Sequence, residues 1–114
     1  NKKERRQESF RVNFDSAEQW DTILSLSREK AVYIFKHSSR CGISSVVLSR
    51  FEKQVKERNE TYFHLHIQGN RFLSNQIAEE LQIRHESPQL IVLKDDKVLA
   101  SGSHYDLLDI VPSL

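Results

Sequence analysis

The chain has 114 residues, of which 38% are hydrophobic and 29% are charged. This length and composition suit one hydrophobic core and not two, and they exclude a disordered chain. The 17 Lys and Arg residues nearly balance 16 Asp and Glu residues, and no apolar stretch approaches the roughly 20 residues that span a bilayer. We therefore expect one domain with neither nucleic acid nor a membrane as a partner.

Cys41 is the single cysteine of the sequence. An intramolecular disulfide is therefore impossible, which excludes the small extracellular scaffolds that disulfides hold together. A lone thiol suits a reducing compartment. We expect a cytoplasmic protein and a monomer.

The first segment, residues 1–9, is charged and aperiodic, which predicts a flexible N-terminal arm before a domain over residues 10–114. Residues 11–14 favour a short edge strand. A helix that runs to about Ser27 follows, because Trp20 and its apolar neighbours recur at helical spacing.

The middle of the chain alternates between strands and helices. Residues 31–35 read AVYIF, a short apolar run typical of a buried strand, and a polar loop follows it. From Ser44 onward the apolar residues share one helix face. Residues 61–67 favour another strand, and residues 71–81 another helix.

The last third of the chain has a different pattern. Residues 89–94 and 97–101 are two short strands joined by a tight turn, and residues 105–111 favour a final helix. A βαβ unit followed by a helix, a β-hairpin and a C-terminal helix is the order of the thioredoxin fold. We therefore predict the α/β class, with a mixed central sheet flanked by helices.

Cys41 falls at the N-terminal edge of the helix that starts near Ser44, where backbone N–H groups favour negative charge. Lys36, His37 and Arg40 precede it within five residues. Cations and a helix N-terminus both favour the thiolate form of a cysteine, which is the nucleophile. A buried structural cysteine is the alternative, and the polar or small residues around Cys41 argue against it.

Three strings of the sequence resemble the YtxJ-type monothiol bacilliredoxins of the thioredoxin-like superfamily. They are Lys36 to Ser44 (KHSSRCGIS), His85 to Gln89 (HESPQ) and Ser101 to His104 (SGSH). Their order and separation make the resemblance far more specific than the C-x-x-S motif alone. One difference is Gly42, because family members typically carry proline there.

The resemblance implies roles for the residues of these strings. Pro88 matches the cis-proline that lies against the reactive cysteine, so the Ser87–Pro88 bond is expected to be cis, with Ser87 free to pair with an extended client chain. Ser44 replaces a resolving cysteine and is expected to bond the Cys41 sulfur or to contact the start of the helix.

The resemblance also implies a site for the small thiol. The start of the last helix, at Ser103 and His104, is where glutaredoxin-like proteins bind a thiol's carboxylate. Together with Lys36 and Arg40 it is expected to hold the carboxylates of bacillithiol, although helix capping explains Ser103 equally well. The predicted catalytic residues are Cys41, Ser44 and Pro88, and the predicted substrate-binding residues are Lys36, His37, Arg40, Gly42, Ser87, Ser103 and His104.

These roles predict an enzyme that removes bacillithiol from protein mixed disulfides. Its partners are bacillithiol or a similar small thiol, as co-substrate, and S-thiolated client proteins, with no cofactor. Two alternatives stay open: a monothiol enzyme that acts on another small thiol, and a redox-silent interaction module. His64 and His66 share one strand face, but a zinc site needs further ligands, so no metal is expected.

Overall fold

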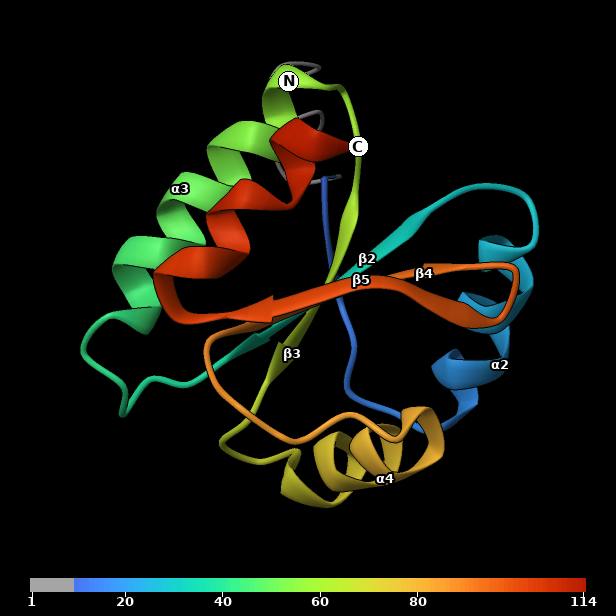
Figure 1. Cartoon of the computed structure of the whole chain (residues 1–114). Helices are drawn as coiled ribbons and strands as arrows, with labels where there is room; N and C mark the ends of the chain where they lie inside the picture. Colours follow the sequence, from blue (N-terminus) through green and yellow to red (C-terminus); the bar gives the residue numbers. More distant parts are fainter. Residues whose placement is uncertain (1–9) are drawn as a thin grey trace, which may run out of the picture.

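The structure is a computed structural model that describes residues 10–114 (Figure 1). The predicted N-terminal arm, residues 1–9, lies outside the described residues. The elements in chain order are β1 (Arg11–Asn13), α2 (Glu18–Ser27), β2 (Val32–His37), α3 (Ser44–Glu57), β3 (Tyr62–His66), α4 (Arg71–Leu81), β4 (Gln89–Lys94), β5 (Lys97–Ser103) and the 3₁₀ helices η1 (His104–Asp109) and η2 (Val111–Ser113). No helix among residues 10–114 has the length and apolar character needed to cross a membrane.

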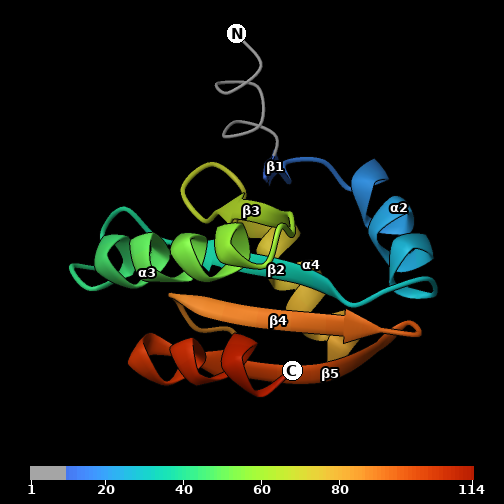
Figure 2. The same cartoon turned by 90° about the horizontal axis from the view of Figure 1, so that it is seen from above.

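The five strands form one mixed sheet in the order β1-β3-β2-β4-β5. β3 pairs in parallel with both β1 and β2, whereas β4 runs antiparallel to β2 and to β5. The parallel pairs are joined through helices and the last pair through a tight turn, as the sequence predicts. The predicted α/β fold with a mixed central sheet is confirmed, and Figure 2 shows the sheet between its helices.

Each face of the sheet is covered by its own hydrophobic core. α3 and the C-terminal 3₁₀ helices cover one face, where Phe35 of β2 packs on Phe51 of α3 with the ring centroids 5.1 Å apart. α2 and α4 cover the other face, where Ile34 packs with Ile77. Successive β2 side chains therefore enter opposite cores, because side chains alternate along a strand.

Two strands extend further than the sequence predicts. β2 continues through Lys36 and His37, which pair with Leu65 and His66 of β3. β5 likewise continues to Ser103, which pairs with Gln89 of β4. Backbone pairing with a neighbouring strand determines where β2 and β5 end. The polar side chains at these positions did not indicate that the strands continue.

The predicted C-terminal helix is present as two 3₁₀ helices, η1 and η2. η1 lies directly over β5 at Gly102, where an added Cβ would lie 3.1 Å from Cδ1 of Ile110 and 3.3 Å from Cα of Leu107. The contact between the two backbones depends on the absence of a side chain at residue 102.

We predict that Gly102→Ala lowers the free energy of unfolding by roughly 1 kcal/mol, because the new methyl group overpacks the contact with η1. Gly42→Ala is the matched control: its Cβ meets nothing within 4 Å, so stability should be unchanged or slightly raised. Urea unfolding of both variants measures the difference. Equal effects of the two substitutions would contradict this packing.

Candidate active site

The three strings singled out in the sequence meet at one end of the sheet. The loop after β2, the segment before β4 and the end of β5 all lie there, because β4 runs antiparallel to both of its neighbours. The strand register places Lys36 opposite Gln89 and Gln89 opposite Ser103. In Figure 1 these segments gather at the left of the molecule.

Cys41 lies in this loop, in the turn that leads into α3. Its side chain is partly exposed, so it is not the buried structural cysteine considered above. Its N–H donates to the carbonyl of Ser38 at 3.3 Å, and its carbonyl accepts the N–H of Ser44 at 3.1 Å. The thiol is thus carried by a hydrogen-bonded turn and remains open to a reactant.

Gln68 holds the outer part of the same loop and was missed by the sequence analysis. Its amide oxygen accepts the N–H of Ser39 at 3.0 Å, and its amide nitrogen donates to the hydroxyl of Ser38 at 3.0 Å. Gln68 follows β3, which ends beside β2. The pairing of these two strands was the available signal, because it places the residues that follow each strand side by side.

Ser44 holds the inner part of the loop. Its side chain is fully buried, and its oxygen lies 2.7 Å from Nδ1 of His37 and accepts the N–H of Ser38 at 3.2 Å. The predicted hydrogen bond to the Cys41 sulfur is wrong: within residues 10–114 the hydroxyl bonds only these two partners. The other expected role of Ser44, a contact at the start of the helix, agrees with its place as the first residue of α3.

Lys36 is not a substrate-binding residue. It is fully buried on the face of the sheet opposite α3, and its amine donates to the carbonyl of Ser74 in α4 at 3.0 Å. The prediction failed because β2 continues to His37, so that Lys36 and His37 point to opposite faces. Burial lowers the pKa of Lys36 to about 8.

The segment around Pro88 has the geometry that the sequence predicts. The Ser87–Pro88 peptide bond is cis, and Ser87 is half-buried. The carbonyl of Pro88 accepts the N–H of His104 at 3.0 Å. Ser103 and His104 therefore lie beside Pro88.

The start of the last helix differs from the expected one. That helix is a six-residue 3₁₀ helix, and the N–H of His104, its first residue, is already bonded to the carbonyl of Pro88. Ser103 lies at the end of β5 and His104 is exposed with a φ of 55°. The backbone N–H of His104 is used by Pro88, so only its exposed side chain is left to contact a ligand.

Arg40 and Gly42 flank the cysteine on the outside of the loop, and both are exposed. The N–H of Arg40 donates to the hydroxyl of Ser38 at 3.3 Å, which fixes the backbone and leaves the guanidinium in solvent. Of the three predicted cations, Arg40 alone combines a permanent charge with exposure next to the thiol.

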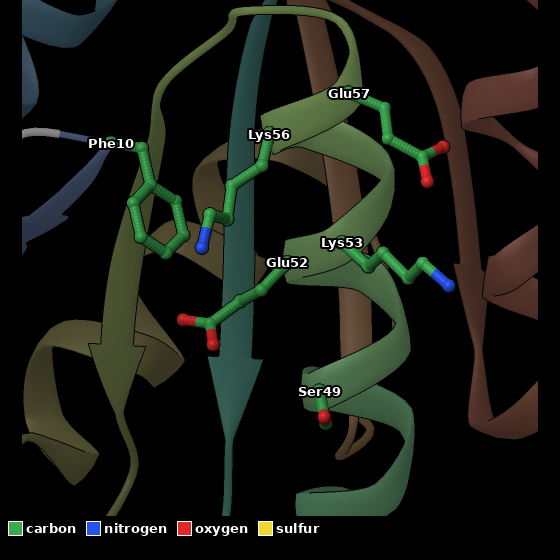
Figure 3. Close-up of a pocket in the computed structure, with 6 residues that line it drawn as sticks. All are labelled: Phe10, Ser49, Glu52, Lys53, Lys56 and Glu57. Atoms are coloured by element: carbon green, nitrogen blue, oxygen red, sulfur yellow. The ribbon is translucent and has the colours of Figure 1, made fainter. Parts of the chain in front are cut away.

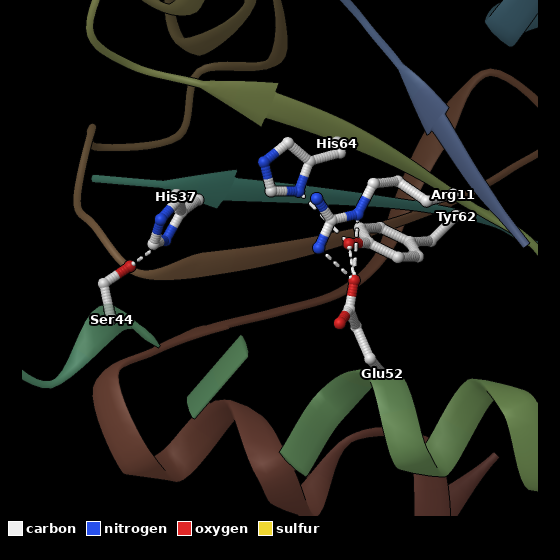
Figure 4. A network of polar contacts seen from close by, with 6 residues as sticks. All are labelled: Arg11, His37, Ser44, Glu52, Tyr62 and His64. Carbon is white, nitrogen blue, oxygen red and sulfur yellow. Dashed lines mark hydrogen bonds and ion pairs between the residues drawn. The ribbon is translucent and has the colours of Figure 1, made fainter. Parts of the chain in front are cut away.

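A polar network extends from His37 along the face of the sheet that α3 covers (Figure 4). The rings of His64 and His66 each lie 5.6 Å from the ring of His37, measured between centroids. The hydroxyl of Tyr62 joins His64 to Glu52, which also pairs with Arg11. Residues 10–114 contain no group of three or more ligands placed to hold a metal ion.

A hollow of about 470 Å³ lies along the outer side of α3, between Phe10 and the helix (Figure 3). Lys56 lies over the ring of Phe10, 5.2 Å from its centroid, and Glu52 lies at the same hollow. None of the predicted site residues lines it. The hollow therefore shares no residue with the predicted site.

One known protein family matches most of the chain. The family model described as "Monothiol bacilliredoxin BrxC" matches residues 12–109, which is most of the chain and includes all three strings. The chain belongs to the monothiol bacilliredoxin family. The matched residues of the chain include Cys41, Ser44 and Pro88, at the end of the sheet described above.

Solved structures resemble this chain over nearly its whole length. A candidate oxidoreductase with a thioredoxin fold is 25% identical, with a TM-score of 0.84 over 94% of this chain and 95% of its own. Thioredoxin from Trypanosoma brucei brucei, at 17% identity, has a TM-score of 0.70 over 89% and 84%. Thioredoxin f2, solved with ferredoxin:thioredoxin reductase, is 23% identical with a TM-score of 0.68 over 90% of both chains.

The buried amine of Lys36 gives a prediction for stability. Its pKa lies near 8 in the folded chain against 10.5 when solvated, so the unfolded chain binds the proton more tightly. Stability should therefore rise between pH 8 and about 10, as the folded chain no longer buries a charge. Lys36→Met removes this cost and should raise the free energy of unfolding at pH 7 by roughly 2–3 kcal/mol.

Urea unfolding of wild type and Lys36→Met at several pH values measures this gain, which should shrink from pH 8 to 10. Lys97→Met is the matched control, because Lys97 is exposed and its loss should not change the slope with pH. A gain for Lys36→Met that is independent of pH would contradict the buried charge.

Proposed function

We propose that this chain is a monothiol thiol–disulfide oxidoreductase that removes bacillithiol from protein mixed disulfides. The observation that carries the proposal is a partly exposed thiol, Cys41, followed three residues later by a buried serine where a dithiol enzyme has its second cysteine. Membership of the bacilliredoxin family supports bacillithiol as the small thiol.

In the first step, the Cys41 thiolate attacks the bacillithiol sulfur of a client–S–S–bacillithiol disulfide. The bond between the two sulfurs of the client adduct breaks, and a new disulfide joins Cys41 to bacillithiol. The client leaves as a thiolate and takes up a proton from solvent. The client cysteine is thereby reduced, and Cys41 is oxidised.

The second step needs a thiol from outside the chain. Ser44 cannot form a disulfide, and Cys41 is the single cysteine of the sequence. A second bacillithiol, as its thiolate, attacks the bacillithiol sulfur of the Cys41 adduct, which releases the Cys41 thiolate and oxidised bacillithiol. Recycling then depends on a reductase for oxidised bacillithiol, and a cytoplasmic site would supply the reducing thiol.

The binding site that we propose for the small thiol is smaller than the one predicted from the sequence. The exposed guanidinium of Arg40 is the cation offered to a carboxylate of bacillithiol, and His104 lies beyond Pro88 on the other side of the loop. Ser87, which precedes Pro88, offers its backbone to an extended client chain. Lys36 takes no part, because it is buried on the opposite face.

Intact mass measurement after incubation with oxidised bacillithiol tests the reaction. Wild type should gain one bacillithiol at Cys41 and lose it again when reduced bacillithiol is added, whereas Cys41→Ala should gain none. Ser44→Ala, a second variant in the same motif, should still form an adduct that bacillithiol removes, because its hydroxyl does not resolve the intermediate.

Oxidised glutathione and coenzyme A disulfide, tested in parallel, separate the small thiols. If the adduct forms faster with either of these disulfides than with oxidised bacillithiol, the corresponding thiol is the co-substrate and not bacillithiol. No adduct with any of the three would reject the exchange reaction and favour a redox-silent interaction module.

The proposed role of Arg40 gives a second test. Arg40→Ala should lower the rate of adduct formation with oxidised bacillithiol roughly 3- to 10-fold, because an exposed charge-assisted hydrogen bond is lost. Arg50→Ala is the matched control, since Arg50 is also exposed but lies on α3 with its guanidinium 6.0 Å from the ring of Tyr105. Equal rate losses in both variants would show a general charge effect and not a carboxylate contact.

A further inference from the structure

The side chain of Gln89 reaches back from β4 to the loop that precedes this strand. Gln89 is the first residue of β4 and directly follows Pro88, and it is buried, with 3% of its surface exposed. Its amide nitrogen donates to the carbonyl of Arg84 at 2.9 Å. A side chain inside the fold thus closes the loop over residues 84–89, which runs from α4 to β4 (Figure 1).

The oxygen of the same Gln89 amide has no partner. Within residues 10–114 it is buried and accepts no hydrogen bond. A buried acceptor without a partner lowers stability, and an apolar side chain of the same shape would avoid that cost. What a glutamine adds at this position, and an apolar residue would not, is the bond to Arg84.

A second contact holds the same loop to α4. Nδ1 of His85 lies 3.3 Å from the hydroxyl oxygen of Ser74, a residue that is fully buried in that helix. The loop is therefore attached to α4 near its beginning and to β4 at its end.

Glu86 and Ser87 lie between these two attachments. Within residues 10–114, their backbone N–H and C=O groups take part in none of the hydrogen bonds that the loops make. Ser87 is half-buried and precedes Pro88, at the end of the sheet that carries the thiol. A backbone that is held in place and has unpaired groups can bind an extended chain as an added strand.

We propose that Gln89 is a positioning residue, whose bond to Arg84 holds the loop in the shape in which Ser87 presents its backbone to the extended chain of a client. A loop that is ordered beforehand need not be ordered by the client, so binding does not carry that entropy cost. The inference rests on the proposed function and deepens it, because it names the residue that prepares the segment for the client.

The rate at which Cys41 attacks a peptide disulfide tests this role. The two probes are the thionitrobenzoate disulfides of a peptide with a central cysteine and of a single blocked cysteine. The Cys41 thiolate attacks the cysteine sulfur of the probe, a disulfide forms between these two sulfurs, and thionitrobenzoate leaves as a coloured thiolate. The ratio of the two rates measures what the extended chain adds, independently of the reactivity of the thiol.

Wild type should react roughly 5-fold faster with the peptide than with the blocked cysteine, because the chain adds backbone hydrogen bonds at Ser87. Gln89→Met keeps the size of the side chain but cannot donate to Arg84, so this ratio should fall towards one.

Gln54→Met is the matched control. Gln54 also donates to a backbone carbonyl at 2.9 Å, that of Leu108, and its oxygen is likewise buried without a partner among residues 10–114. Because Gln54 holds η1 and not the loop before β4, the ratio should stay as in wild type.

Three outcomes would each overturn the inference: a wild-type ratio of one, an unchanged ratio in Gln89→Met, or an equal fall in Gln54→Met. If Gln89→Met does not fold, Gln89→Asn replaces it, because asparagine keeps the amide but is one methylene too short to reach Arg84. The assay contains no bacillithiol, so failure of the proposed small thiol is seen separately, in the mass experiment.

Discussion

The buried hydroxyl of Ser44 connects the three parts of the chain on which the site depends. It bonds the ring of His37 at the end of β2 and the backbone of Ser38 in the loop, while Ser44 itself begins α3. α3 is in turn fixed to the sheet by the packing of Phe51 on Phe35. The turn that carries Cys41 is therefore attached at both ends to parts of the hydrophobic core, and a loop held in this way presents its thiol in one orientation.

The alternation of side chains along β2 separates two kinds of polar residue. His37 points to the face of α3 and reaches the cysteine loop, whereas Lys36 points to α4 and reaches the carbonyl of Ser74. A buried lysine without a carboxylate partner lowers stability while it is charged. Among the described residues Lys36 bonds the carbonyl of Ser74, so the interior of the fold explains its place in the motif.

Much of the fold follows from the sequence because apolar spacing marks it. α3 begins at Ser44 and α4 spans Arg71–Leu81 as predicted, since both helices bury one regular face. The ends of β2 and β5 could not be predicted, because they depend on pairing with strands distant in the sequence. The type of the C-terminal helix also depends on tertiary contact, at Gly102.

The site was predictable to a different degree at each residue. The positions of Cys41 and of the cis bond before Pro88 follow from motifs that are local in the sequence. The role of Gln68 and the contact of Ser44 with His37 depend on which segments lie side by side at the end of the sheet, so they required the structure. Lys36 shows the same limit, because β2 continues to His37 by pairing with β3, and the alternation of side chains along the strand then sends Lys36 to the opposite face from His37.

The central claim is that a single thiol, without a second cysteine, performs complete exchange cycles. Turnover of a peptide–S–S–bacillithiol disulfide, with the protein at one-hundredth of the peptide concentration and reduced bacillithiol in excess, tests it most directly. The account predicts many peptide thiols released per protein molecule, faster than bacillithiol alone, and no acceleration by Cys41→Ser. Release that stops at one equivalent per protein, or an equal rate with Cys41→Ser, would contradict it.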